Sequence, residues 1–161
     1  MANGIYKFTE MFDIRTKSHR TIQQFRNSTG FIFAPVLEDN GKLGIGRYGL
    51  GEERGNTRVF YTVEFSNGAS IKCSPDTEFR LYDSSYKRCE ELTTDDKLFY
   101  TQFTSDPKDV DINIVSIIRK DINEIYMAKL EPSEGTGLIP LIPEGAKIDS
   151  VTDLIFICVK E

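Results

Sequence analysis

Apolar and polar residues alternate in short segments along most of this chain, and the clearest such segment spans residues 58–66. One face of it carries β-branched and aromatic residues at every second position, namely Val59, Tyr61, Val63 and Phe65. A period of two in residues of this kind predicts a β-strand. Asn67-Gly68 follows, and both residues tolerate positive φ, so we predict a hairpin with residues 69–73 as the partner strand.

The segments after this hairpin predict further short strands joined by turns. Residues 74–76 (Ser-Pro-Asp) have the composition of a turn, because proline fixes φ and aspartate bonds to nearby backbone N–H groups. Residues 78–82 are predicted to be extended and residues 83–85 to turn. We expect residues 86–92 to be a short connection and residues 97–103 to be another strand.

The chain before residue 58 predicts two or three strands. Residues 5–14 alternate loosely and indicate one or two strands, followed by a polar turn over residues 15–20. Residues 31–37 are strongly apolar and predict a strand, which Pro35 should place at a sheet edge or a bulge. Residues 39–43 (Asp-Asn-Gly-Lys-Leu) then predict a hairpin turn.

The C-terminal third also alternates. Residues 112–119 predict a strand that is buried on both faces or nearly so, with a turn at residues 120–121 and a return strand over residues 124–130. Residues 138–142 and 151–159 are two further apolar segments. Since no long amphipathic helix is apparent, we predict an all-β fold, or nearly so, built from short strands.

Over residues 58–100 the order of these features resembles the middle of an intein. The resemblance rests on a strand, an Asn-Gly turn, a second strand, Ser74-Pro-Asp-Thr77, Phe79-x-Leu81, a turn, Tyr86-Lys-Arg-x-Glu-Glu-Leu92 and Asp95-Asp-Lys-Leu98. It is weaker over residues 20–43 and 112–150. The resemblance implies a Hint-like horseshoe of short antiparallel strands and hairpins, the fold that inteins share with Hedgehog autoprocessing domains.

The resemblance also identifies the positions where splicing residues would stand. Inteins carry a Thr-x-x-His motif whose histidine protonates or polarises the scissile amide. In this chain Ser74 and Asp76 fall within the matching segment, and Thr77 replaces the histidine. A threonine hydroxyl cannot supply a proton at neutral pH as an imidazole can.

The two splice junctions are also altered. No Cys or Ser lies near residues 6–8, where the resemblance places the N-terminal nucleophile, and Thr9 is the nearest hydroxyl. At the C-terminal junction the family pattern His-Asn-Ser corresponds to Ile148, Asp149 and Ser150, of which only Ser150 is retained. We therefore expect no catalytic residue in the ordinary sense of this family.

Other candidate chemistry is sparse. The single histidine, His19, is expected in an exposed loop, and together with Cys73, Cys89 and Cys158 it makes no metal-binding pattern. The cysteines are predicted to be buried or half-buried free thiols. Gly44-x-Gly46-x-x-Gly49 matches a dinucleotide motif as letters, but no amphipathic helix follows it, so a flexible or bulged hairpin is expected and no cofactor.

Composition limits the classes of function. A length of 161 residues predicts one domain, here 1–161, and 39% hydrophobic with 28% charged residues predicts a globular protein. A net charge of −5 disfavours nucleic acid as the main partner. The sequence also lacks an apolar run long enough for a membrane-spanning helix and a signal-peptide pattern, so we expect no membrane association and a cytoplasmic location.

Three hypotheses for function remain. The first is a degenerate Hint domain that acts as a protein-binding or structural module in a phage or mobile-element setting, with contact regions at residues 44–56 and 133–137. The second is a self-processing domain that cleaves or splices with non-standard residues, supported by Asp149-Ser150. The third is an unrelated small β-barrel that binds a partner.

Overall fold

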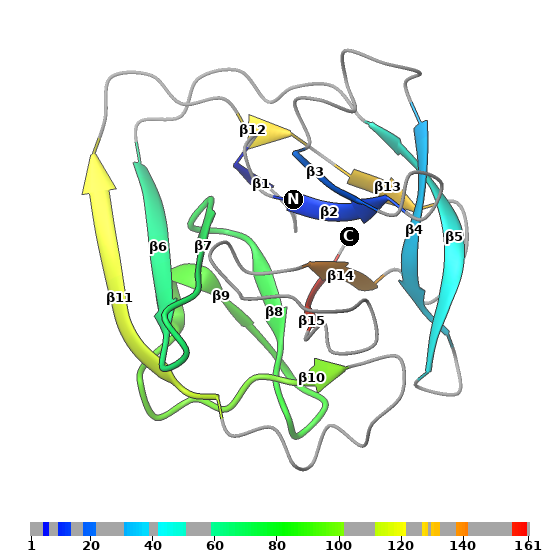
Figure 1. Cartoon of the computed structure of the whole chain (residues 1–161). Coiled ribbons are helices and arrows are strands. Elements are labelled where there is room, and N and C mark those ends of the chain that lie inside the picture. The colour runs from blue at the N-terminus through cyan, green and yellow to red at the C-terminus, as the bar shows by residue number, and fades with distance from the viewer. Residues whose placement is uncertain are drawn as a thin grey trace.

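The described part of the chain consists almost entirely of β-strands (Figure 1). The computed structural model describes residues 5–6, 10–13, 18–21, 31–38, 42–50, 59–101, 112–121, 127–128, 130–132, 138–141 and 156–160. The strands are β1 Ile5–Tyr6, β2 Glu10–Asp13, β3 Ser18–Thr21, β4 Phe31–Leu37, β5 Leu43–Leu50, β6 Val59–Phe65, β7 Ser70–Cys73, β8 Glu78–Arg80, β9 Tyr86–Arg88, β10 Tyr100–Thr101, β11 Ile114–Asp121, β12 Met127–Ala128, β13 Leu130–Pro132, β14 Leu138–Leu141 and β15 Phe156–Lys160. A short 3₁₀ helix, η1, spans Cys89–Glu91. The predicted all-β fold is confirmed.

The predicted β6–β7 hairpin is the centre of a five-stranded sheet with the order β11-β6-β7-β1-β12. Its turn has the predicted chemistry: Gly68 adopts a φ of 85°, and the Ala69 N–H donates to Asn67 Oδ1 at 3.0 Å. Gly68 is the residue that can take this φ at no steric cost. The turn therefore sets the register of β6 and β7, in which Cys73 lies opposite Tyr61.

A second sheet collects around the C-terminal strand. β15 pairs with β10, β8 and β14, and β8 pairs in turn with β9. Figure 1 shows β14 and β15 near the middle of the molecule, with β11 at one margin and the β4–β5 hairpin at the opposite margin. The remaining described strands form the sheet β13-β5-β4 and the pair β2-β3.

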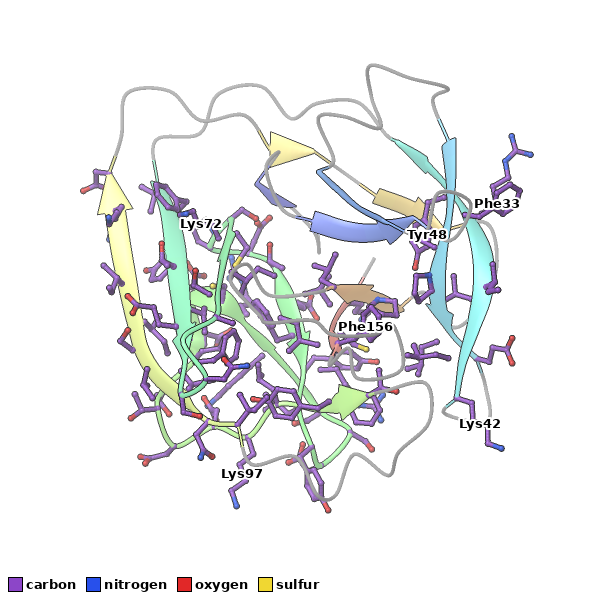
Figure 2. The ribbon with its side chains drawn as sticks, in the orientation of Figure 1. Phe33, Lys42, Tyr48, Lys72, Lys97 and Phe156 are labelled. Atoms are coloured by element: carbon purple, nitrogen blue, oxygen red, sulfur yellow. The ribbon has the colours of Figure 1, made fainter. Side chains whose placement is uncertain are left out.

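The hydrophobic core joins residues from three of these sheets. Val63 and Ile71 come from the first sheet, Phe79 and Val159 from the second, and Tyr48 from β5. Figure 2 shows Tyr48 on the inner side of the β4–β5 hairpin and Phe33 on its outer side. The Tyr48 hydroxyl donates to the Pro35 carbonyl oxygen at 2.8 Å, which satisfies a polar atom that would otherwise be costly to bury.

The glycines at positions 44–49 lie in a regular strand, so the expected flexible or bulged hairpin is wrong for this part of residues 44–56. β5 pairs with β4 residue by residue, and Pro35 of β4 lies opposite Ile45 of β5. β4 is the edge strand of its described sheet, as the presence of Pro35 predicts. A Cβ built on Gly46 would meet Val36 Cγ1 at 2.5 Å. This glycine makes room for a core side chain, and no phosphate-binding loop with a following helix is present in residues 42–50.

Several local expectations are wrong. Residues 86–88 form β9 instead of a plain connection, and residues 18–21 form β3 instead of a turn, so His19 lies in a strand opposite Phe12. Residues 120–121 continue β11 instead of turning. In the predicted return segment, β12 pairs with β1 and β13 pairs with β5, so neither forms a hairpin with β11.

The predicted burial of the strand over residues 112–119 is also wrong. Within β11 the side chain of Val115 is 52% exposed and that of Ile118 is 38% exposed. β11 pairs with β6 on one side and ends the described order of its sheet. Apolar residues in a strand do not by themselves require both of its faces to be buried, because the surface of a folded protein normally includes apolar side chains.

Replacing Thr62 by valine should raise the free energy of unfolding by about 1 kcal/mol. Thr62 is buried in β6, and its Oγ1 finds no hydrogen-bond partner in the part of the chain that the structure describes. Valine has nearly the same shape and removes the unpaired hydroxyl. Urea denaturation measures the change. Thr77→Val is the matched control, because the buried Thr77 hydroxyl is hydrogen-bonded to Ser74 and its loss should lower stability. A loss of stability in Thr62→Val would contradict the prediction.

Candidate functional site

The segment that matches the Thr-x-x-His motif is a tight turn at the end of β7. The Thr77 N–H donates to the Ser74 carbonyl oxygen at 3.2 Å, which closes the turn over residues 74–77. Ser74 and Thr77 are buried and Asp76 is half-buried. The predicted turn over residues 74–76 is therefore confirmed, and it brings these three polar side chains together.

These three side chains bond to one another. Ser74 Oγ donates to Asp76 Oδ1 at 2.6 Å, and the same Ser74 Oγ lies 2.9 Å from Thr77 Oγ1. A serine hydroxyl has one proton, so with that proton given to Asp76 the Thr77 hydroxyl is the donor in the second bond. The result is a chain of hydrogen bonds from Thr77 through Ser74 to the Asp76 carboxylate.

The 3₁₀ helix η1 is hydrogen-bonded to the backbone of the turn. The Cys89 N–H donates to the Thr77 carbonyl oxygen at 2.7 Å, and the Glu90 N–H donates to the Pro75 carbonyl oxygen at 3.1 Å. The first N–H groups of a helix lack partners within the helix, so they are available for such bonds. The backbone of the turn is thus fixed by η1 independently of the side chains.

The N-terminal strand lies beside this turn. Ile5 of β1 is the register partner of Cys73, the residue directly before Ser74. The resemblance expects the N-terminal nucleophile near residues 6–8, and the structure places the described part of this segment, Ile5–Tyr6, next to β7. Residues 7–9 lie outside the described residues, and for Ile5–Tyr6 only the backbone is described.

Cys73 is not poised as a nucleophile. Burial raises the pKa of the Cys73 thiol well above its ordinary value, and the hydrogen bond and negative field of Cys89 raise this pKa further. The Asp76 carboxylate acts in the same direction, and a hydrogen bond with Thr77 opposes them. Since the thiolate is the attacking species, a thiol held neutral at pH 7 reacts slowly.

The other predicted site residues are not brought to this turn by the described structure. Ile148, Asp149 and Ser150 lie outside the described residues. His19 is in β3 of the separate pair β2-β3. Within the residues that the structure describes, no group of three or more His, Cys, Asp or Glu side chains could hold a metal ion.

One feature of the site was missed by sequence reasoning, namely the approach of Cys89 to Cys73. The two sulfur atoms lie 3.0 Å apart, and both thiols are fully buried. The expectation of buried free thiols is confirmed for all three cysteines. The available signal was the position of Cys73 and Cys89 on either side of residues 78–88. The two ends of that segment come together because residues 86–88 form a strand that pairs with β8, whereas the sequence pattern predicts a connection there.

The arrangement as a whole lacks a group that could exchange protons near neutral pH. Its polar members are two hydroxyls and one carboxylate, and an imidazole is absent from residues 59–101.

None of the described helices is long and apolar enough to cross a membrane.

Comparison with known proteins shows the fold. No family model matches the chain. The chain is similar over nearly its whole length to the DnaB intein from Synechocystis sp. (17% identity, TM-score 0.66, covering 97% of this chain and 98% of the intein). It is also similar to a bacterial intein-like domain from Clostridium thermocellum (10% identity, TM-score 0.64, covering 98% of this chain and 99% of that domain). A third similar structure is the TvoVMA intein (12% identity, TM-score 0.65, covering 96% of this chain and 97% of the intein).

A curated relative matches a shorter part. A DNA gyrase subunit of Synechocystis sp. is 33% identical over 66 residues, which is 41% of this chain and 6% of that protein. The structural similarities, all below 25% identity, show that the chain has the intein-type Hint fold. The resemblance found in residues 58–100 is thus confirmed at the level of the fold.

Proposed function

We propose that this Hint-fold chain has lost splicing chemistry and acts as a protein-binding or structural module. The observation that carries the proposal is the hydrogen-bond chain of Thr77, Ser74 and Asp76 in the turn. A hydroxyl, that of Thr77, occupies the position where the resemblance expects a histidine, and it is hydrogen-bonded to Ser74. The turn then has no group matched in pKa to protonating an amide nitrogen.

A binding role is supported by the exposed apolar side chains of β11. Val115 and Ile118 are exposed on a strand of eight residues that ends the described order of its sheet. Such an edge offers backbone hydrogen-bonding groups and side chains to an added strand of a partner protein. β11 replaces residues 44–56 as the contact region that we favour, because residues 44–49 belong to a paired strand. The other predicted contact region, residues 133–137, lies outside the described residues. A phage or mobile-element setting would suit a degenerate Hint domain, by analogy with the fold.

The loss of splicing is tested by intact mass. The chain carries short tags at both ends and is kept for a day with and without a thiol reductant, beside an active intein that carries the same tags. We expect an unchanged mass for this chain and processed products for the active intein. Loss of mass at Asp149-Ser150 or near residues 6–9 would overturn the proposal and establish the self-processing alternative.

The binding role is tested with a surface variant. The double variant Val115→Glu with Ile118→Glu places charges on β11, and Tyr82→Ser changes an exposed aromatic residue elsewhere as the matched control. Proteins from the source cells that the unaltered chain and the Tyr82→Ser variant retain, and that the double variant does not, would support β11 as the contact surface. Equal retention by all three would contradict it.

A further inference from the structure

Two cysteines outside the splicing positions face each other beside the turn. Cys73 ends β7 and Cys89 begins η1, and their sulfur atoms lie 3.0 Å apart although the residues are 16 positions apart in the sequence. Both side chains are fully buried. The short distance is a feature of the tertiary fold, since β7 and β9 are not paired with each other.

The backbone holds the two thiols in this position. The β8–β9 hairpin folds the chain back, and two hydrogen bonds, from Cys89 N–H to Thr77 O and from Glu90 N–H to Pro75 O, tie η1 to the turn. On the other side, Cys73 is fixed between Tyr61 of β6 and Ile5 of β1. The folded backbone of this chain therefore keeps the two sulfur atoms next to each other.

We propose that Cys73 and Cys89 are a disulfide-forming pair that hydrogen peroxide oxidises. One thiol reacts with peroxide to give a sulfenic acid and water. The second thiol then attacks the sulfenic sulfur, forms the S–S bond and releases a second water. In total the two thiols give up two protons and two electrons, and one peroxide is reduced to two waters.

The surroundings of the pair set its reactivity. The attacking species is the thiolate, and burial and the neighbouring thiol favour the neutral form of Cys73. Oxidation should be slow at neutral pH and should accelerate roughly tenfold per pH unit as the thiolate fraction rises. Peroxide is small enough to act where a bulky disulfide reagent cannot reach.

The cross-link would join β7 to η1 around the 74–77 turn and the β8–β9 hairpin. A disulfide across a loop of this size restricts the unfolded chain more than the folded one. The melting temperature should rise by roughly 5–10 °C on oxidation. This inference does not depend on whether the chain splices, because it concerns the unprocessed chain.

Cys158 provides a matched control within the same molecule. It is also buried, and burial raises its pKa to about 12. It packs with Leu37 in a hydrophobic cluster that does not include Cys73 or Cys89. Its burial resembles that of both members of the pair, and its raised pKa resembles that of Cys73, but neither of the other two cysteines lies in its cluster.

The test oxidises the folded full-length chain with peroxide at about pH 8, then unfolds it in guanidinium with iodoacetamide and measures its mass. The reduced chain should take three alkyl groups and the oxidised chain one, with a proteolytic peptide pair linked through Cys73 and Cys89. Treatment of the oxidised chain with dithiothreitol should restore the uptake of three alkyl groups. Cys158→Ala should still form the link and take no label after oxidation.

Cys73→Ala and Cys89→Ala should each form no intramolecular link and take two labels after the same treatment. The proposal would be overturned if the unaltered oxidised chain took three labels, or if Cys158 appeared in the linked peptides. It would also be overturned if the sulfur atoms advanced to sulfinic acids without forming a bond. The Cys158→Ala result decides the matter even if the other two variants do not fold.

Discussion

Replacing Phe79 by alanine should lower the free energy of unfolding by about 3–5 kcal/mol. Phe79 is 0% exposed in β8, opposite Val159 of β15 on one side and Lys87 of β9 on the other. Its ring belongs to the core cluster that joins the two larger sheets. Removing it takes away buried apolar surface and leaves a cavity that three strands would have to collapse to fill.

Urea denaturation of the purified chain measures this loss. Tyr82→Ala is the matched control, since it removes an aromatic ring of similar size from a side chain that is 61% exposed. We expect a change below about 0.5 kcal/mol for that variant. Equal losses for the two variants would show that Phe79 is not the core residue that joins these sheets.

The second large effect is a loss of stability at alkaline pH. Burial raises the pKa of Cys158 to about 12 and the pKa of Tyr100 to about 12, and burial raises the pKa of Cys73 in the same direction. Each of these groups is neutral when protonated, and burial disfavours its ionised form. The folded chain therefore binds the proton more tightly than the unfolded chain. The stabilisation is complete below the unfolded pKa and is lost as pH rises towards the folded pKa.

Each unit of pH increase in this window should lower the free energy of unfolding by about 1.4 kcal/mol for each group that is ionised only in the unfolded chain. Urea denaturation at pH values from about 8 to about 11, with reductant present, should therefore show a steep decline above about pH 9. Cys158→Ala and Tyr100→Phe should each make the decline shallower. An unchanged slope in both variants would mean that these groups ionise freely in the folded state.

The local features of the fold could be predicted from the sequence because they depend on neighbouring residues. Asn67-Gly68 predicts the β6–β7 hairpin through the φ that Gly68 adopts, and the turn over residues 74–77 follows from its proline and aspartate. The order of segments in residues 58–100 was sufficient to predict the Hint fold, which the structural similarities confirm.

Pairings between distant segments could not be predicted in this way. Alternation over residues 112–119 gives the strand but not its place at the end of a sheet, so the burial of Val115 was overestimated. The partners of β12 and β13 lie near residues 5 and 50, and nothing in the local pattern distinguishes them from β11. The contact between Cys73 and Cys89 was missed for the same reason, because it depends on β9.

The central position of β15 has a consequence for the order in which the chain assembles during its synthesis. β8, β10 and β14 are all made before β15, yet each of them takes β15 as a sheet neighbour. Likewise β1 leaves the ribosome long before its partner β12. Isolated hairpins are marginally stable in water, and loops that join such distant strands close slowly. The nascent chain should therefore hold only transient hairpins at first. The first sheet should be completed after residues 127–128 have emerged, and the second only after residues 156–160 have emerged.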